Sequence, residues 1–187
     1  MANMNYVLYS KEFEMPRGEL ATKLPDGCRL EIWTPSKLCF YPGGIKGIRR
    51  KMDFISIWIL NYLLKLPAKS GCSVFLVANA KKIIHHSIVT AKSFKYPFMA
   101  EDDLQVGMIF TKKEFRRKGL AEHTINEILK KYEKCGRKIW YITEDRNIPS
   151  RALAEKFGFS NYSRVIRKRT LLGGKYDVPG NWGNRRK

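Results

Sequence analysis

Acidic residues and paired cysteines are scarce in this sequence of 187 residues. It has 17 Asp and Glu against 36 Lys and Arg, which gives a formal net charge of +19. The cysteines have no C-x-x-C spacing, so neither a zinc site nor a disulfide framework is expected, and the sequence predicts no bound metal. They are Cys28, Cys39, Cys72 and Cys135.

Long hydrophobic runs are also missing. The longest apolar stretch, residues 54–64, is interrupted by Ser56 and Asn61 and is too short to span a bilayer, so no transmembrane segment is expected. The first residues, MANMNYVLYSKEFEMP, have neither the basic start nor the apolar core of a secretory signal. Together with the unpaired cysteines, these absences predict a cytoplasmic protein.

The overall composition is that of a globular chain, with 44% hydrophobic and 12% aromatic residues. We expect a single domain over residues 1–187, with a motif-bearing core at about 73–172 and a basic, partly mobile tail at 173–187. The net charge concentrates anions near the surface, whether nucleic acid, anionic lipid or a phosphorylated small molecule. Charge alone does not choose among these partners.

The strongest signal lies in residues 104–122, LQVGMIFTKKEFRRKGLAE. Residues 104–111 are mostly apolar and rich in strand formers, which predicts a largely buried strand. From Ala121 onward, apolar positions recur at helical spacing opposite Glu and Lys, which predicts an amphipathic helix. A basic turn that contains Gly119 connects the strand to the helix.

This junction favours a bound phosphate. The first turn of a helix has N–H groups without an intrahelical partner and carries the positive end of the helix dipole. Gly119 lets the backbone approach a ligand without a Cβ in the way, and small Ala121 keeps the next turn open. Many nucleotide and phosphate sites share this plan, so it does not identify a function by itself. Long-range attraction comes from Arg116, Arg117 and Lys118.

Two motifs resemble one known superfamily. Arg116-x-x-Gly119-x-Ala121 is similar to the Q/R-x-x-G-x-G/A signature of the GCN5-related N-acetyltransferase (GNAT) superfamily, in the strand-to-helix context that this signature requires. Downstream, after a predicted strand at 138–143, the sequence resembles the superfamily's N-x-x-A/S-x-x-L-Y-x-K-x-G-F segment. The matching positions are Asn147, Ser150, Leu153, Lys156, Gly158 and Phe159.

The resemblance implies an α/β (α+β) fold with a mixed, mostly antiparallel sheet, helices on both faces and a splayed central pair of parallel strands. By analogy these strands are residues 105–111 and 138–143, and the thioester of acetyl-CoA, the acyl donor, lies in the gap between them. The backbone of Ile109, Phe110 and Thr111 would then run beside the pantetheine arm as an added strand does.

The resemblance also implies the remaining cofactor contacts. Asn147 would hydrogen-bond the cofactor arm, and Ser150 would lie beside it on the following helix. The pyrophosphate would rest on the basic turn, whose residues are Arg116, Arg117, Lys118, Gly119, Leu120, Ala121 and Glu122.

Acyl transfer to an amine requires a neutral amine, stabilisation of the tetrahedral oxyanion and a proton for the leaving thiolate. The superfamily often takes that proton from a tyrosine in its L-Y-x-K segment, where this sequence has Ala154. The remaining candidates for the proton donor are Tyr141, Tyr162 and water, and the alternative is chemistry that relies mainly on proximity.

Three sets of residues are candidates for the general base. Glu144 follows the second splayed strand, and His85 and His86 are adjacent on a predicted strand, so at most one of the two histidines faces the cleft. The third set is the acidic run Glu101, Asp102 and Asp103, which precedes the central strand near the expected substrate entrance. We predict Glu144, His86 and Tyr141 as catalytic residues, although each also suits an ordinary structural role.

Outside this region, strand and turn signals predict strands at 5–9, 28–34, 73–78, 83–91 and within 159–172, and a helix at 150–157. Residues 52–66 have the length and leucine content of a helix that Pro67 stops and that a basic cluster around Arg49 precedes. Its apolar residues lie on nearly every face, which is compatible with burial, a homodimer contact or a peripheral membrane contact.

The leading function is an acetyl-CoA-dependent N-acetyltransferase that transfers an acetyl group to a primary amine by direct attack in a ternary complex. The aromatic linker at 94–99 and the phosphate-attracting charge suit a small-molecule acceptor such as an amino sugar or a nucleotide-linked sugar. One alternative is acetylation of a protein or peptide amine. The other is a non-catalytic module of the same fold that binds nucleic acid or an anionic membrane, of which nucleic acid is not favoured.

Overall fold

The computed structural model describes residues 5–12, 22–34, 73–80, 82–93, 95–133, 136–170 and 173–178. Two predicted features, the basic cluster around Arg49 and the helix at 52–66, lie outside the described residues. Among the helices that are described, none is long and apolar enough to cross a membrane.

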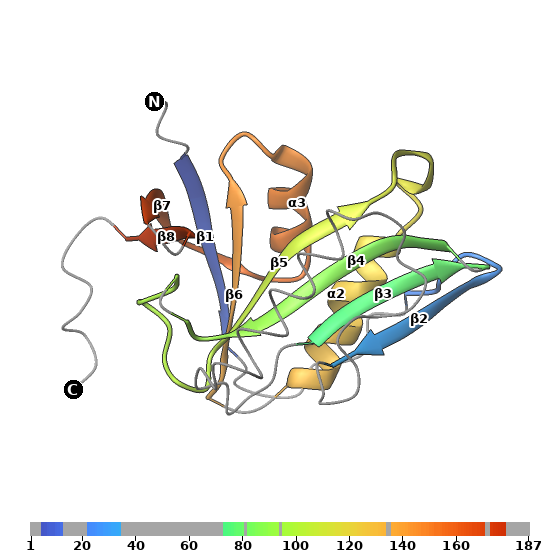
Figure 1. Cartoon of the computed structure of the whole chain (residues 1–187), viewed down its shortest axis with the longest axis horizontal. Coiled ribbons are helices and arrows are strands. Elements are labelled where there is room, and N and C mark those ends of the chain that lie inside the picture. The colour runs from blue at the N-terminus through green and yellow to red at the C-terminus, as the bar shows by residue number, and fades with distance from the viewer. Residues whose placement is uncertain are drawn as a thin grey trace.

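One eight-stranded mixed sheet forms the centre of the molecule (Figure 1). Its strands are β1 (Asn5–Glu12), β2 (Cys28–Trp33), β3 (Ser73–Asn79), β4 (Lys82–Ala91), β5 (Leu104–Thr111), β6 (Lys138–Glu144), β7 (Ser160–Thr170) and β8 (Gly173–Asp177). In space they follow the order β2-β3-β4-β5-β6-β1-β7-β8, and only the β5–β6 pair is parallel. The strands predicted from the sequence are all present, and the mixed, mostly antiparallel sheet is confirmed.

The N-terminal strand β1 lies between β6 and β7. Its side chains alternate between the faces of the sheet, so Val7 and Tyr9 join one hydrophobic cluster and Tyr6 and Leu8 join another. All four side chains are buried. Both faces of this strand are therefore covered, which explains why its sequence shows no clear apolar and polar alternation.

Strands β5 and β6 form a fork. Residues 104–106 pair with residues 139–141, but β5 continues to Thr111 and β6 to Glu144 without further pairing between them. Figure 1 shows the two strands meeting at one end and diverging toward the other. We call the region between residues 107–111 of β5 and 142–144 of β6 the fork, and its apex is the Val106–Tyr141 pair. The predicted splayed pair of parallel strands is confirmed.

A β-bulge in β5 accompanies the fork. The pairing of β5 with β4 shifts between His86–Phe110 and Ile88–Gly107. Met108, inside the shifted stretch, has a φ of +48°, a left-handed conformation that non-glycine residues rarely adopt. Because a bulge bends its strand and increases the local twist, it turns the end of β5 away from β6.

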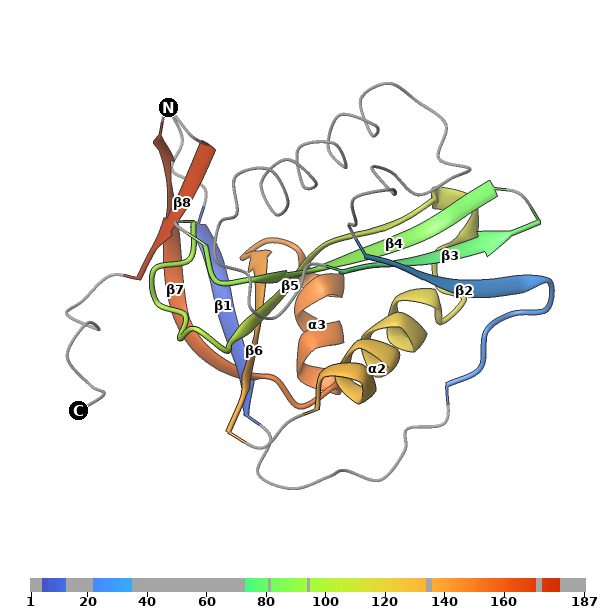
Figure 2. The same cartoon turned by 60° about the horizontal axis from the view of Figure 1, so that its bottom comes forward.

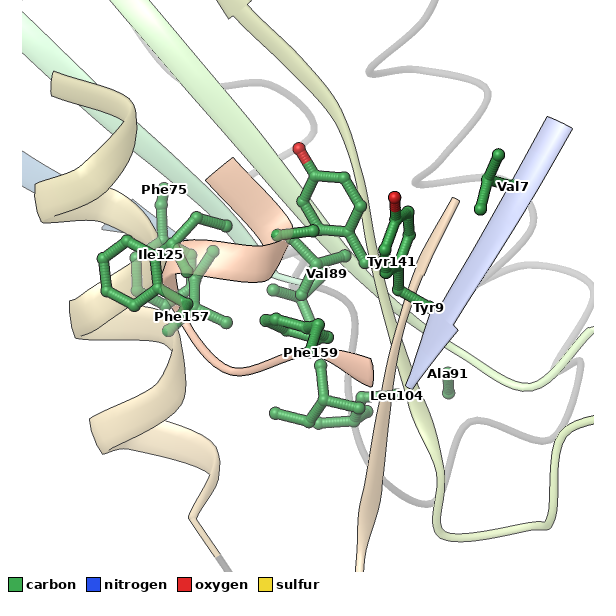
Figure 3. Close-up of a cluster of buried hydrophobic side chains, with 14 residues drawn as sticks. Val7, Tyr9, Phe75, Val89, Ala91, Leu104, Ile125, Tyr141, Phe157 and Phe159 are labelled. Atoms are coloured by element: carbon green, nitrogen blue, oxygen red, sulfur yellow. The ribbon is translucent and has the colours of Figure 1, made fainter. Parts of the chain in front are cut away.

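Two helices cover one face of the sheet (Figure 2). Helix α2 (Leu120–Tyr132) packs on β3, β4 and β5, and helix α3 (Ile148–Lys156) packs on β6 and β7. Figure 3 shows the core beneath them, to which Ile125 of α2, Phe157 after α3 and the sheet residues Tyr9 and Tyr141 all belong. The sequence predicts helices on both faces of the sheet. The described helices α2 and α3 share one face, and the helix predicted at 52–66 lies outside the described residues.

The segment before β5 covers part of the opposite face. Met99 packs there with Trp140, and Asp103 fixes the segment in place. The Asp103 carboxylate is 2% exposed and accepts hydrogen bonds from Trp140 Nε1 and the Ala100 amide, both at 2.8 Å, and from the Lys138 amide at 3.3 Å. This carboxylate therefore joins β5, β6 and the linker.

The acidic run precedes β5 at its paired end, away from the open end of the fork, and its place at the substrate entrance stays a prediction. Residue 104 begins β5 at its paired end, and the fork opens at the other end of the strand. Asp103 is engaged in structural hydrogen bonds, and Glu101 forms an ion pair with Lys92 at 2.8 Å. Asp103 and Glu101 therefore both have structural roles in the linker.

Part of the tail predicted at 173–187 forms a strand that the sequence did not predict. Gly173–Asp177 forms β8 and pairs antiparallel with β7. Asp177 also forms ion pairs with Lys168 at 3.0 Å and with Lys175 at 3.4 Å. The sequence pattern did not indicate this strand, for which β7 supplies the ladder partner, and the mobility of the tail at 173–187 stays a prediction.

Candidate active site

The turn between β5 and α2 offers unpaired amides to an anion. Helix α2 begins after Gly119, which has a φ of +73°, and no side chain caps it. The His123 amide donates to the Gly119 carbonyl at 2.9 Å, so within the described residues the amides of 120–122 have no backbone acceptor. Arg117 also has a positive φ of +61°. This backbone presents N–H groups and the positive end of the helix dipole, as the sequence predicts.

The space above this turn can accept a pyrophosphate. A Cβ built on Gly119 would meet no heavy atom within 4 Å. Arg116, Arg117 and Lys118 are all exposed around it. Arg116 Nε also donates to the Thr111 carbonyl at 3.2 Å, so the turn is tied to the end of β5. An open glycine, unpaired amides and three cations fit the phosphates of coenzyme A.

Glu122 carries the one negative charge on this turn, and Lys156 neutralises it. The Lys156 Nζ to Glu122 Oε2 distance is 2.5 Å. The pair is partly exposed, so it contributes little to stability, but it removes a charge that would repel phosphate. Among the turn residues predicted to bind pyrophosphate, the side chain of Leu120 is buried, so this residue can offer only its backbone amide. The others are exposed or partly exposed: Arg116, Arg117, Lys118, Gly119, Ala121 and Glu122.

Three predicted pantetheine contacts lie in β5 beyond its last pair with β6. Ile109 packs toward the core beneath the helices, and Phe110 stacks on His86 with ring centroids 5.5 Å apart. Thr111 Oγ1 shares a hydrogen bond of 2.8 Å with His85 Nδ1. The edge of this stretch that faces β6 has no ladder partner in the described sheet, so it suits an amide-bearing arm added as a strand.

Asn147 and Ser150 begin helix α3. Asn147 is the N-cap, and its Oδ1 accepts a hydrogen bond from the Ser150 amide at 3.3 Å. This cap explains why α3 starts at Ile148, ahead of the predicted start at 150. The side-chain oxygen of Asn147 serves the helix, its amide N–H groups can donate to a cofactor arm, and that contact stays a prediction.

Tyr141 lies at the apex of the fork, beneath α3. Its hydroxyl is 2.8 Å from Ser150 Oγ, and its side chain is 2% exposed. Burial raises the pKa of the Tyr141 phenol, and the hydrogen bond with Ser150 opposes this only in part, so the phenol is protonated at neutral pH. Figure 3 shows the hydroxyls of Tyr141 and Tyr9 pointing in the same direction. Ala154 is 1% exposed in the same core and has no group that could donate a proton.

His86 lies on the face of the sheet away from the helices. His85 faces the helices, because its cross-strand partner Val77 packs against Leu120 of α2. Successive side chains on a strand alternate, so His86 points to the opposite face together with its partner Phe110. It therefore flanks the fork from the β5 side.

Glu144 flanks the fork from the β6 side on the same face. Trp140 belongs to the cluster on the face away from the helices, and Glu144 follows it at an even spacing along β6. Its Oε2 accepts a hydrogen bond from Arg146 Nε at 2.8 Å. Tyr162 packs edge-on against Trp140 on this face, with centroids 4.9 Å apart, so it does not share a site with Tyr141.

His85 has a structural role. It is 0% exposed, and its ring nitrogens bond Thr111 Oγ1 at 2.8 Å and Ser87 Oγ at 3.1 Å. Burial, with a smaller contribution from His86, lowers the pKa of His85 to about 3. The ring stays neutral at pH 7 and fixes the end of β5, which excludes it as the general base.

Stability should decrease with acidification because of His85. Its native pKa of about 3 lies below the ordinary value of 6.5, so the unfolded state binds more protons between these values. The contribution of the neutral His85 ring to the free energy of unfolding is complete above pH 6.5 and is lost as the pH falls toward 3. The slope of the free energy of unfolding against pH approaches about 1.4 kcal/mol per pH unit in this range. Urea unfolding over this range should show a shallower slope in His85→Gln; equal slopes would contradict this assignment.

A polar network around Tyr9 was not predicted from the sequence. The Tyr9 hydroxyl donates to Glu155 Oε1 at 3.0 Å and accepts from Arg151 Nε at 3.2 Å. Arg151 also pairs with Asp145 at 3.2 Å. The network joins β1 to α3 and to the turn after β6, and it supports the helix that carries Ser150. The only feature of the sequence that pointed to this network was the position of Tyr9 on an apolar strand.

Comparison with known families gives one match. The profile of the family described as acetyltransferase (GNAT) family matches residues 60–159, which is more than half of the chain. This region contains the fork, the basic turn and α3. No curated protein sequence matches the chain.

Several solved structures share the fold. A tandem GNAT protein from the clavulanic acid biosynthesis pathway has a TM-score of 0.60 at 12% identity, over 89% of this chain and 53% of its own. A GCN5-related N-acetyltransferase from Sphaerobacter thermophilus has a TM-score of 0.55 at 12% identity, over 88% and 50%. The aminoglycoside N-acetyltransferase AAC(6')-Iy in complex with CoA has a TM-score of 0.51 at 15% identity, over 80% and 99%. This chain thus spans about half the length of the first two proteins.

Proposed function

This chain belongs to the GNAT family of acetyltransferases, and from that premise we propose that it transfers an acetyl group from acetyl-CoA to the primary amine of an amino sugar. The observation that carries the proposal is the continuity of residues 104–122, in which the part of β5 beyond its described ladder with β6 is followed by the N-terminus of α2, where no side-chain cap is described. An extended thioester arm and a pyrophosphate match these two features in that order.

The net charge of +19 supports an acceptor that carries phosphate. A similar fold occurs in an aminoglycoside N-acetyltransferase, which brings amino sugars into consideration for this chain. Aminoglycosides are polycations, however, and the positive field of this protein would repel them, whereas it would attract a nucleotide-linked amino sugar. We therefore rank the nucleotide-linked amino sugar first among the acceptors.

The test combines ligand binding with turnover. Thermal unfolding is measured with and without acetyl-CoA, and then amines of four kinds are compared for release of free CoA: a nucleotide-linked amino sugar, its free sugar, an aminoglycoside and a peptide. The proposal expects stabilisation by acetyl-CoA and fastest turnover of the nucleotide-linked sugar, with a KM that rises with salt. Stabilisation without turnover would favour the non-catalytic binding module, and fastest turnover of the peptide would favour protein acetylation.

The acceptor would enter on the face of the fork away from the helices. His86 and Glu144 flank this face from β4 and β6 respectively. The imidazole of His86 has ring nitrogens that can accept a proton, so it is suited to take the proton of the attacking amine through water. The Glu144 carboxylate is suited to bind the acceptor as an ammonium ion before it loses that proton.

These two roles predict different kinetic losses. His86→Gln should lower kcat by roughly 100-fold or more with little change in KM, whereas Glu144→Gln should mainly raise the KM for the amine. Steady-state kinetics with the best acceptor measure both. The matched control is Glu101→Gln, which breaks an ion pair of the same 2.8 Å length at the other end of β5 and should leave both constants unchanged. A control as impaired as Glu144→Gln would contradict the assignment.

A further inference from the structure

The apex of the fork contains one buried phenol with a hydrogen-bonded path toward solvent. Tyr141 occupies the last paired position of β6, opposite Val106 of β5. Its hydroxyl is 2.8 Å from Ser150 Oγ in the first turn of α3. We propose that Tyr141 donates the proton that the leaving thiolate of CoA requires, and that Ser150 relays the replacement proton. This inference rests on the proposed acyl transfer.

The position of Tyr141 follows from the length of β5. Pyrophosphate on the amides of residues 120–122 fixes one end of the carrier, and the edge of β5 that faces the fork leads from Thr111 back to Val106. At about 3.3 Å per residue this edge spans roughly 17 Å, a length that suits an extended pantetheine arm. The sulfur would then reach the apex, where the strands close and Tyr141 lies.

Tyr141 also lies on the correct face. Together with Ile125 of α2 and Phe157 after α3, it belongs to the cluster between the sheet and the helices. The turn that starts α2 lies on that side as well, because Leu120 packs against Val77 and Ile84 beneath it. The acceptor groups His86 and Glu144 lie on the other face. The amine would therefore attack from one side of the fork, and the thiolate would leave toward the phenol on the other.

The protonation state of Tyr141 is suitable for a donor. Its phenol has a pKa above the ordinary value because it is buried, so it carries its proton throughout the neutral range. The side chain of Ser150 is only half-buried, and the preceding residues Asn147 and Ile148 are exposed. Ser150 therefore connects a buried phenol to water, which allows the proton to be replaced.

The proposed step is balanced in atoms and charge. The amine nitrogen bonds to the thioester carbonyl carbon, and the bond between that carbon and sulfur breaks. The sulfur takes the Tyr141 proton and becomes a thiol, and the resulting phenolate takes a proton from Ser150, which water replenishes. The proton lost from the amine nitrogen passes through water to His86, which is in register with Phe110, four residues along β5 from the apex.

The test uses the thiol of bound CoA and does not require an acceptor. The full-length protein is saturated with free CoA, and the pKa of the bound thiol is measured from its thiolate absorbance as the pH is raised. If Tyr141 donates to the thiolate, the bound thiol should have a lower pKa in the wild type than in Tyr141→Phe, by about one unit. Tyr162→Phe removes a tyrosine hydroxyl on the other face and should match the wild type.

Turnover of the best acceptor provides the second measurement. Tyr141→Phe should lower kcat by roughly 100-fold, and Ser150→Ala should lower it less while leaving the pKa of the bound thiol near the wild-type value. Equal thiol pKa values in the wild type and Tyr141→Phe, with CoA still bound, would overturn this inference alone. Failure of CoA to stabilise the wild-type protein would instead overturn the proposed function. Thermal unfolding of each variant shows that it is folded.

Discussion

Replacing Gly119 with tryptophan should abolish the stabilisation of the protein by acetyl-CoA. Gly119 has a φ of +73°, and the space above it is the proposed position of the pyrophosphate. A ligand present at 100 times its Kd adds about 2.7 kcal/mol to the free energy of unfolding, which raises Tm by roughly 5–10 °C in a domain of this size. The tryptophan ring would occupy the phosphate position, so Gly119→Trp should show no such shift.

Gly136 offers a matched control for the backbone strain. It has a φ of +75°, and a Cβ built on it would also meet nothing within 4 Å. It lies beyond the other end of α2, roughly 20 Å from Gly119 along a helix of 13 residues. Both substitutions should cost about 1–2 kcal/mol of stability, but Gly136→Trp should retain the full response to acetyl-CoA. Equal responses in the two variants would remove the proposed phosphate site.

Replacing Asp103 with alanine should cause the largest loss of stability. Its buried carboxylate accepts hydrogen bonds from Trp140 Nε1 and from the amides of Ala100 and Lys138. Removing the acceptor leaves buried donors unpaired, so we expect a loss of roughly 3–5 kcal/mol in the free energy of unfolding, measured by urea denaturation.

The neighbouring residue Asp102 provides the control. It is exposed, so Asp102→Ala should change the free energy of unfolding by no more than about 0.5 kcal/mol. Because Asp103 lies at the paired end of β5, Asp103→Asn should still be stabilised by acetyl-CoA, with a smaller loss of stability than the alanine variant. A stable Asp103→Ala protein that has lost only turnover would restore the acidic run as a catalytic candidate.

The sequence predicted those parts of the site that depend on local backbone geometry. The strand, glycine turn and helix of residues 104–122 are contiguous, so their periodicity and the position of Gly119 were sufficient to predict a free helix N-terminus. The splayed strand pair followed from resemblance, and the structure confirms it. The bulge at Met108 accompanies the divergence of β5 from β6. The sequence did not indicate it, because methionine rarely adopts a positive φ.

Contacts between distant segments could not be predicted in this way. Tyr9 meets Glu155 across 146 positions of sequence, and Asp103 meets Trp140 across 37. The position of β1 between β6 and β7 determines the first contact, and no pattern within the strand encodes its neighbours. For the same reason His85 and His86 looked equivalent in the sequence, whereas pairing with Val77 turns His85 into the core.

The short contact at the fork divides the protein into two structural units. Strands β2 to β5 with α2 form one unit, and β6, β1, β7 and β8 with α3 form the other. Their sheets are joined through three residue pairs, whereas β1 and β6 within the second unit share seven. Backbone pairing at the joint is therefore short, but buried side chains of both units form one core, to which Ile125 and Tyr141 belong. We therefore expect the width of the opening to depend on the packing of this shared core more than on the strand pairing.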